Sequence, residues 1–435
     1  MHMADALLSP AVGGTMVVAA AGTIAWCSAK VKTEMDDRKV PLMGVLGAFL
    51  FAAQMINFTL PATGSSGHLG GGLLLAILLG PHAAFLTIAS VLVVQALFFA
   101  DGGLLALGCN IINLGFFPAF IAYPLIYRPI AGHTPAPGKI GAASMAAAIA
   151  GLQMGAFAVV LETVLSGISA LPFTAFVSLM QPIHLGIGVV EGAVTAIIVG
   201  FVHKARPDIF TNSGKVKHGF MKSIVPAFLV LALVTGGFIS WFATEKPDGL
   251  EWSIKQLIGK EELKGAKEGL RGRLARLQEK LAFLPDYNFK KPEEKNPASA
   301  ATSAEAAKPG AGGKKDGGSK LGTSLAGIAG ALLTLGLALL TGFILRKRQQ
   351  LAATKPHSHI HAHPHRHEHE HLHSHGDISH SHGHSHEHSH PHPHVHDHSQ
   401  PHPADPNPQH SHKAKAAEHS HEHGAVEHGS HDHTH

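Results

Sequence analysis

The chain has 435 residues, of which 45% are hydrophobic and only 15% are charged, and its formal net charge is +4. This small and scattered charge argues against a nucleic-acid-binding protein. Cys27 and Cys109, both inside apolar runs, indicate neither a disulfide framework nor a cysteine metal site. Residues 10–243 are mostly apolar, whereas residues 351–435 contain 30 of the 37 histidines, which predicts a membrane part followed by a solvated tail.

The chain begins with MHMADALLSP, which contains no lysine or arginine and therefore lacks the basic start of a cleavable signal peptide. The aminopeptidase that removes the initiator methionine requires a small second residue, and His2 is large. We therefore expect Met1 to remain, with a free α-amine.

Apolar stretches of roughly 17 to 25 residues, the length that crosses a bilayer, predict an all-α polytopic membrane bundle. They lie near residues 9–28, 41–60, 82–100, 104–127, 139–166, 171–202, 221–243 and 321–345. The second stretch carries the small residues Gly44, Ala48 and Ala52 at four-residue spacing, which permits close helix packing, either internally or against another membrane subunit.

Four connectors are rich in lysine and arginine, and such connectors stay on the cytoplasmic side. They are residues 30–39, 128–139, 203–222 and 346–348. The chain must cross an even number of times between the first two, which requires a short crossing at Leu69 to Gly80. We therefore predict about seven N-terminal and two C-terminal spans in a prokaryotic inner (plasma) membrane. The N-terminus would lie outside and the tail in the cytoplasm.

This pattern divides the chain into three parts. Residues 1–205 form the seven-span bundle, residues 215–348 form a two-span unit with an external segment at 247–320, and residues 349–435 form a disordered, histidine-rich cytoplasmic tail that buffers metal. The external segment begins with the PDGLE motif, which is Pro247, Asp248, Gly249, Leu250 and Glu251, and its linker at residues 296–320 should be disordered.

Two histidines then lie on the outer face: His2, before the first span, and His68, in the glycine-rich connector PATGSSGHLGGG. An X-His N-terminus chelates a metal through the α-amine of Met1 and through the amide and imidazole nitrogens of His2. His68 supplies a fourth nitrogen, and four nitrogens in a plane favour Ni(II) or Cu(II). The alternative is that His2 is accidental and that His68 is a solvated loop residue.

Other polar residues support this site or the bundle. Ser65 and Ser66 are candidates for hydrogen bonds to the ligands, and Asn57 either supports the site or joins helices. The remaining intramembrane ionisable residues are His82, Glu162, His184 and Glu191. We interpret His184 and Glu191, seven residues apart, as a structural pair on one helix face. Zinc hydrolysis by these four residues is a weaker alternative, because no HExxH motif is present.

Several motifs together resemble the substrate-binding subunit of energy-coupling-factor nickel and cobalt importers, the NikM/CbiM family. They are MHMADALLSPAVGG, GSSGHLGGG, LGCNIINLGF and PIHLGIGVVEG, all within residues 1–205. The two-span unit with its PDGLE motif looks like the NikN/CbiN accessory component, fused to the first. The histidine-rich tail is not part of the family pattern.

The resemblance implies that Met1, His2 and His68 hold the ion. It also implies partners, a transmembrane coupling (T) subunit and cytoplasmic ATPase (A) subunits. The chain itself contains no GxxxxGK[ST] phosphate loop, so we expect a transport subunit and not an enzyme. Ni(II) is the expected cargo, without an organic cofactor, and the alternative is Co(II) for cobalamin synthesis. A membrane-anchored metal store or chaperone is the alternative of a different class.

Overall fold

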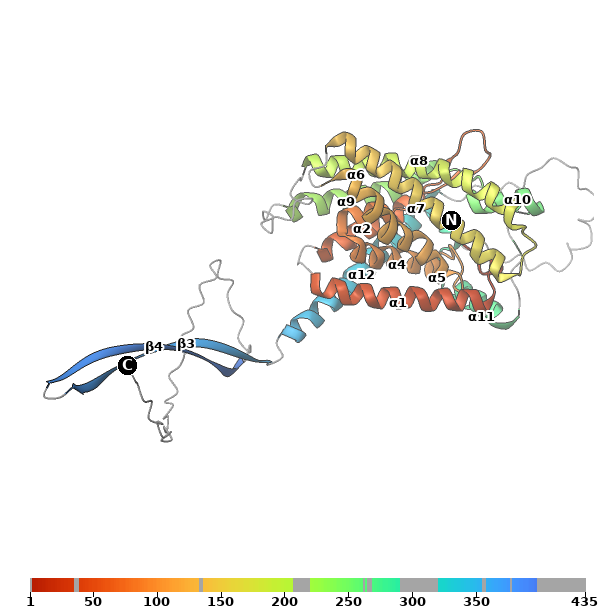
Figure 1. Cartoon of the computed structure of the whole chain (residues 1–435). Coiled ribbons are helices and arrows are strands. Elements are labelled where there is room, and N and C mark those ends of the chain that lie inside the picture. Colours follow the sequence, from red (N-terminus) through yellow and green to blue (C-terminus); the bar gives the residue numbers. More distant parts are fainter. Residues whose placement is uncertain are drawn as a thin grey trace, which may run out of the picture. The chain divides into compact units, whose positions relative to one another are not determined.

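The structure is a computed structural model that describes residues 2–34, 39–132, 136–205, 220–260, 263, 268–289, 320–353, 357–375 and 378–396. It contains two compact units, Met1–Leu351 and Ala352–His435. The first unit holds the helical bundle, and Figure 1 shows α2 and α4 inside it.

The bundle follows the apolar stretches of the sequence. Its helices are α1 (Pro10–Glu34), α2 (Lys39–Gln54), α3 (Gly72–Leu79), α4 (Pro81–Phe98), α5 (Leu107–Ile111), the π-helical η2 (Ile112–Tyr127), α6 (Arg128–Ala131), α7 (Pro137–Ser166), α8 (Phe173–Ala205), α9 (Phe220–Gly237) and α12 (Lys320–Ala353). Shorter elements connect them: η1 (Asp5–Leu7), β1 (Phe58–Thr59), β2 (Ser66–Gly67), η4 (Ile239–Phe242), α10 (Gly249–Ile258), α11 (Gly269–Leu281) and η5 (Pro285–Tyr287).

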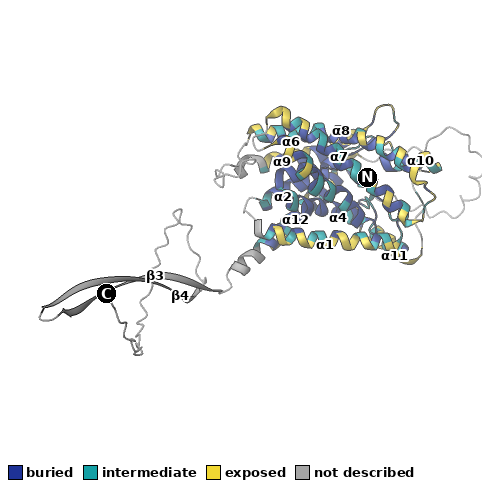
Figure 2. Cartoon of the chain, viewed as in Figure 1, coloured by how far each residue is buried: buried dark blue, intermediate teal, exposed yellow. Residues whose placement is uncertain are grey.

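Burial separates inner from outer helices. Figure 2 shows buried residues concentrated in α2 and α4, whereas the outer helices expose large apolar side chains, such as Val18, Leu165 and Ile197. Apolar side chains on the outside are satisfied by lipid and not by water. Among the described residues, six helices are long and apolar enough to cross a membrane, and two shorter apolar helices lie at Lys39–Gln54 and Val225–Gly237. The chain is therefore a polytopic helical membrane protein, as the sequence predicts.

The predicted short crossing at Leu69 to Gly80 contains α3, which has eight residues. At 1.5 Å per residue this helix rises about 12 Å, less than the ~30 Å of a hydrocarbon core. The predicted span at 104–127 is continuous through α5, η2 and α6, with Pro118 and Pro124 inside the π-helical part. Proline lacks an N–H group and opposes a regular α-helix, which accounts for the wider turns.

The predicted two-span unit packs directly on the bundle. A methyl group added at Gly44 of α2 would lie 2.9 Å from Leu335 and Leu339 of α12, so this small-residue face receives a helix of the same chain. Gly236 of α9 and Gly327 of α12 pack backbone to backbone.

The tail differs from the prediction of disorder in its first half. Strands β3 (His357–His375) and β4 (Ile378–His396) pair antiparallel, and in every second pair, from His357 and His396 to His373 and His380, a histidine faces a histidine. The alternation of histidine with a second residue type has the period of two that a strand requires, which accounts for this hairpin. The remainder of the predicted disordered tail and the linker at 296–319 lie outside the described residues.

Candidate metal site

The N-terminal segment is fixed by hydrogen bonds to the start of α5 and the loop before it. The backbone N–H of Met3 donates to Oδ1 of Asn110 at 2.8 Å, and the Met3 carbonyl accepts from the backbone N–H of Gly103 at 2.9 Å. The carboxylate of Asp5 accepts from the N–H of Ala106 at 3.0 Å, and Met3 is fully buried. These contacts hold the segment inside the bundle.

His2 lies beside the loop between α4 and α5. Its Nδ1 is 3.1 Å from Oδ1 of Asp101, and its side chain is 7% exposed. Gly102, which follows Asp101, has φ +80°. A Cβ at Gly102 would lie 2.8 Å from Nδ2 of Asn110 and 3.5 Å from Cβ of His2. Glycine is thus required both by the backbone conformation and by the approach of the N-terminal segment.

His68 is carried by a loop that folds back into the bundle. Strands β1 and β2 pair at its start, and Nε2 of Gln54 donates to the Gly70 carbonyl at 2.9 Å. Both carboxylate oxygens of Glu191 on α8 accept backbone N–H groups, from Gly70 at 2.7 Å and Gly71 at 3.0 Å. These bonds hold Gly70, which lies two residues after His68, and Gly71, which directly precedes α3.

The loop brings His68 against His2. Their rings stack with centroids 4.8 Å apart and planes 4° apart. Nδ1 of His68 lies 3.1 Å from the Leu69 carbonyl; because a carbonyl only accepts, Nδ1 carries the proton and Nε2 has the lone pair. Within the part of the chain that the structure describes, no three His, Cys, Asp or Glu side chains are arranged to hold a metal. The described residues bring two imidazoles, those of His2 and His68, together at this place.

The charges around the two rings suit a divalent cation. Burial, and then the charge of neighbouring groups including His2, lowers the pKa of His68 to about 3, so this imidazole is neutral at physiological pH. Burial raises the pKa of Asp101, but the charge of His2 and hydrogen bonds from His2 and Tyr287 outweigh it and keep the pKa below its ordinary value. The site therefore combines a neutral imidazole with a nearby carboxylate.

The two-span unit contacts both histidine-bearing segments. The backbone N–H of Ser66 donates to the Pro247 carbonyl at 2.8 Å, and its hydroxyl donates to the Lys246 carbonyl at 2.7 Å. Near His2, the Tyr287 hydroxyl donates to the carboxylate of Asp101 in a short hydrogen bond. The PDGLE motif thus bonds Ser66, which precedes His68 by two residues. Tyr287 bonds Asp101, the residue whose carboxylate contacts His2.

The motif itself is a helix start. Oδ1 of Asp248 accepts from the N–H groups of Leu250 and Glu251 at 2.8 and 2.9 Å, and the Glu251 carboxylate accepts from the N–H of Asp248 at 3.1 Å. This is a capping box that begins α10. Burial raises the pKa of Asp248, but neighbouring positive charge and the N–H of Glu251 outweigh it and lower the pKa to about 2.

The predicted site residues have different positions in the structure. His2 and His68 come together, whereas Met1 lies outside the described residues. The hydroxyl of Ser65 donates to the Ser66 carbonyl, and the Asn57 carbonyl accepts from the N–H of Thr244 at 2.9 Å. Asn57 and Ser66 therefore hold the second unit; a role in supporting the ligands directly stays a prediction.

The predicted pair of His184 and Glu191 is wrong. Glu191 bonds the loop after His68, and Nδ1 of His184 bonds the Met180 carbonyl at 2.8 Å. Seven residues of helix separate the two by about 10.5 Å along the axis, which is too far for contact. Sequence reasoning also did not find Asp101 or Tyr287; the only signal is the Asp-Gly-Gly turn at residues 101–103, beside a predicted span.

Comparisons with known proteins agree with this arrangement. The family model described as "Cobalt uptake substrate-specific transmembrane region" matches residues 2–209, and the PDGLE domain model matches residues 222–347. A protein of Haloquadratum walsbyi, provisionally named a metal transport protein, is 36% identical over 49% of this chain and 94% of its own length. The cobalt transport protein CbiM of Sorangium cellulosum is 32% identical over 41% of this chain and 79% of its own. The fused nickel transport protein NikMN of Rhodobacter capsulatus is 28% identical over 66% of this chain and 88% of its own.

Proposed function

Because the chain belongs to the family of cobalt uptake substrate-specific transmembrane regions, with a fused PDGLE domain, we propose that it is the metal-specificity subunit of an energy-coupling-factor importer. It binds Ni(II) at the outer face and delivers it inward. The observation that carries this proposal is the contact between His2 and His68, residues 66 positions apart, at a chain terminus anchored inside the bundle.

The proposed ligands are the α-amine of Met1, the amide and imidazole nitrogens of His2, and the imidazole of His68. His2 contributes two of the four nitrogens, its amide nitrogen and Nδ1 of its ring, so Nδ1 exchanges its contact with Asp101 for the ion. Four nitrogens in a plane favour Ni(II) over Co(II). Relatives are named for both metals, so Co(II) is the second candidate. The two metals are distinguished by comparing the uptake of labelled Ni(II) with the uptake of labelled Co(II) in cells that carry the whole importer.

Transport requires partners that this chain does not supply. We assign the energy to cytoplasmic ATPase subunits and the reorientation of the bundle to a transmembrane coupling subunit. The fused PDGLE unit contacts the backbone beside His68 and the carboxylate beside His2, and this supports a role in loading or opening the site. The tail would lie in the cytoplasm and buffer the released ion.

The test is equilibrium Ni(II) binding to the purified chain after His2→Ala, or after one glycine is inserted before Met1. The insertion leaves every side chain in place and moves only the α-amine away from His2. Both changes should abolish tight binding, whereas His82→Ala, a histidine that contacts the ring of Trp26, should not. Tight binding that survives the insertion would refute the proposed ligands.

A metal store that uses the histidine-rich tail is the alternative function. Deletion of residues 351–435 separates the two, since an importer keeps Ni(II) uptake without the tail and a store loses its capacity. The separation of Ala352–His435 as its own compact unit makes this deletion practicable.

A further inference from the structure

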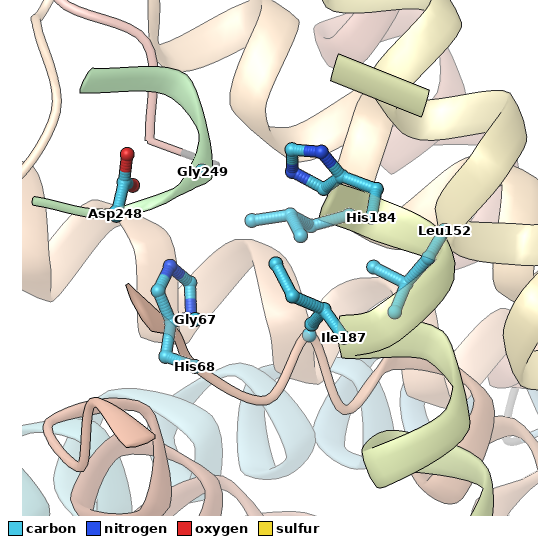
Figure 3. A pocket seen from close by; sticks show the side chains of 9 residues that line it. Gly67, His68, Leu152, His184, Ile187, Asp248 and Gly249 are labelled. Carbon is cyan, nitrogen blue, oxygen red and sulfur yellow. The ribbon is translucent and has the colours of Figure 1, made fainter. Parts of the chain in front are cut away.

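A small cavity lies next to His68. It is lined by Gly67, His68, Gly70, Leu114, Leu152, His184, Ile187, Asp248 and Gly249, and it has room for about one water molecule, with a volume of about 10 Å³. Figure 3 shows how the His68 loop, α8 and the start of α10 surround it. The bundle and the PDGLE unit therefore build this cavity together.

His184 presents an unused lone pair there. It is fully buried, and its Nδ1 donates to the Met180 carbonyl at 2.8 Å, which leaves Nε2 as an acceptor. Nε2 has no hydrogen-bond partner among the described residues. A neutral imidazole that is oriented through one nitrogen by a carbonyl, with the other nitrogen open, is the usual arrangement of a metal-binding histidine.

The PDGLE motif supplies close contact and negative charge. A Cβ at Gly249 would lie 2.7 Å from Cγ2 of Ile183, 3.0 Å from Cε1 of His184 and 3.4 Å from its Nε2, so glycine lets α10 start against this part of α8. Asp248 lines the same cavity, and its carboxylate caps the start of α10 through Oδ1. His68, whose Nε2 has the lone pair, completes a set of two imidazoles and one carboxylate.

We propose that His68, His184 and Asp248 form a second, transient position for the transported divalent cation. This inference rests on the proposed function, because His68 is shared between the two positions. In the structure these three groups are not arranged around one point. The position forms when the His68 ring turns from its stack with His2 toward the cavity, and the ion then exchanges the chelate of residues 1 and 2 for His184 and the carboxylate. The fused unit thereby becomes a direct participant in ion transfer.

The experiment uses Co(II) alone as the probe, with a chain that ends at Leu351, because Met1–Leu351 is a compact unit and the tail histidines would bind the probe. His2→Ala breaks the chelate and leaves the second position. In this background, His184→Asn keeps an N–H donor for the Met180 carbonyl but removes the imidazole Nε2 that would bind the ion. We expect it to weaken the remaining Co(II) binding by at least about tenfold in equilibrium dialysis. Gly249→Ala should have the same effect, because its methyl group presses on the His184 ring.

A direct readout comes from His184→Cys in the same background. A cysteine that binds the ion produces a thiolate-to-Co(II) charge-transfer band in the near ultraviolet, and His82→Cys, the matched control, should produce none. Absence of the band in His184→Cys, or undiminished Co(II) binding in both His184→Asn and Gly249→Ala, would overturn the second position. A failure of the proposed function would give a different result, because tight Co(II) binding would then survive the His2→Ala substitution alone.

Discussion

The carboxylate of Glu191 should set the position of His68, and Glu191→Gln tests this. The carboxylate accepts the backbone N–H groups of Gly70 and Gly71 at 2.7 and 3.0 Å. A glutamine keeps one acceptor oxygen and turns an NH₂ group toward the other N–H. One hydrogen bond to a charged group, about 1.5 to 3 kcal/mol, is lost, and one buried donor is left unpaired. Since about 1.4 kcal/mol corresponds to a factor of ten, Ni(II) affinity should fall roughly 10- to 100-fold.

The measurement is competition for Ni(II) between the purified protein and a chromogenic chelator of known affinity. Glu162→Gln is the matched control, because Glu162 is also buried but its carboxylate accepts from Asn113 at 2.8 Å. We expect the control to bind Ni(II) within about threefold of the original chain. Equal affinities for Glu191→Gln and the original chain would refute the argument that main-chain bonds to Glu191 position His68.

Three further outcomes follow from the structure. Asp248→Ala removes the capping box of α10 and should destabilise the chain by about 1 kcal/mol in thermal unfolding, whereas Asp248→Ser should retain most of this. Tyr287→Phe removes the hydrogen bond to Asp101 and should cost about 1 kcal/mol in the same assay. Ni(II) affinity, measured by dialysis, should fall as pH decreases from 8 to 6, because protons compete for the α-amine, whose ordinary pKa is about 7.7. His68, with its pKa near 3, adds nothing to this loss; an affinity independent of pH would exclude the amine as a ligand.

The sequence predicts the membrane helices well because each is encoded locally by an apolar stretch of the required length. It also predicts that His2 and His68 meet, since loop charges place both on one face. It does not reveal Asp101, Tyr287 or the contacts of Glu191. Each of these depends on packing between segments far apart in the chain: Tyr287 reaches Asp101 across 186 positions. A buried glutamate on a helix has the same sequence pattern whether it pairs with a neighbour or accepts from a loop.

The fusion of the two units also has a physical consequence for the site. A chain terminus and a glycine-rich loop lose conformational freedom when they are ordered, so both need many restraining contacts. The bundle supplies those from Asn110 and Glu191, and the PDGLE unit supplies those from Pro247 and Tyr287. Loss of the PDGLE contacts would leave each histidine restrained from one side only. The arrangement of the proposed metal site is therefore a joint property of both units.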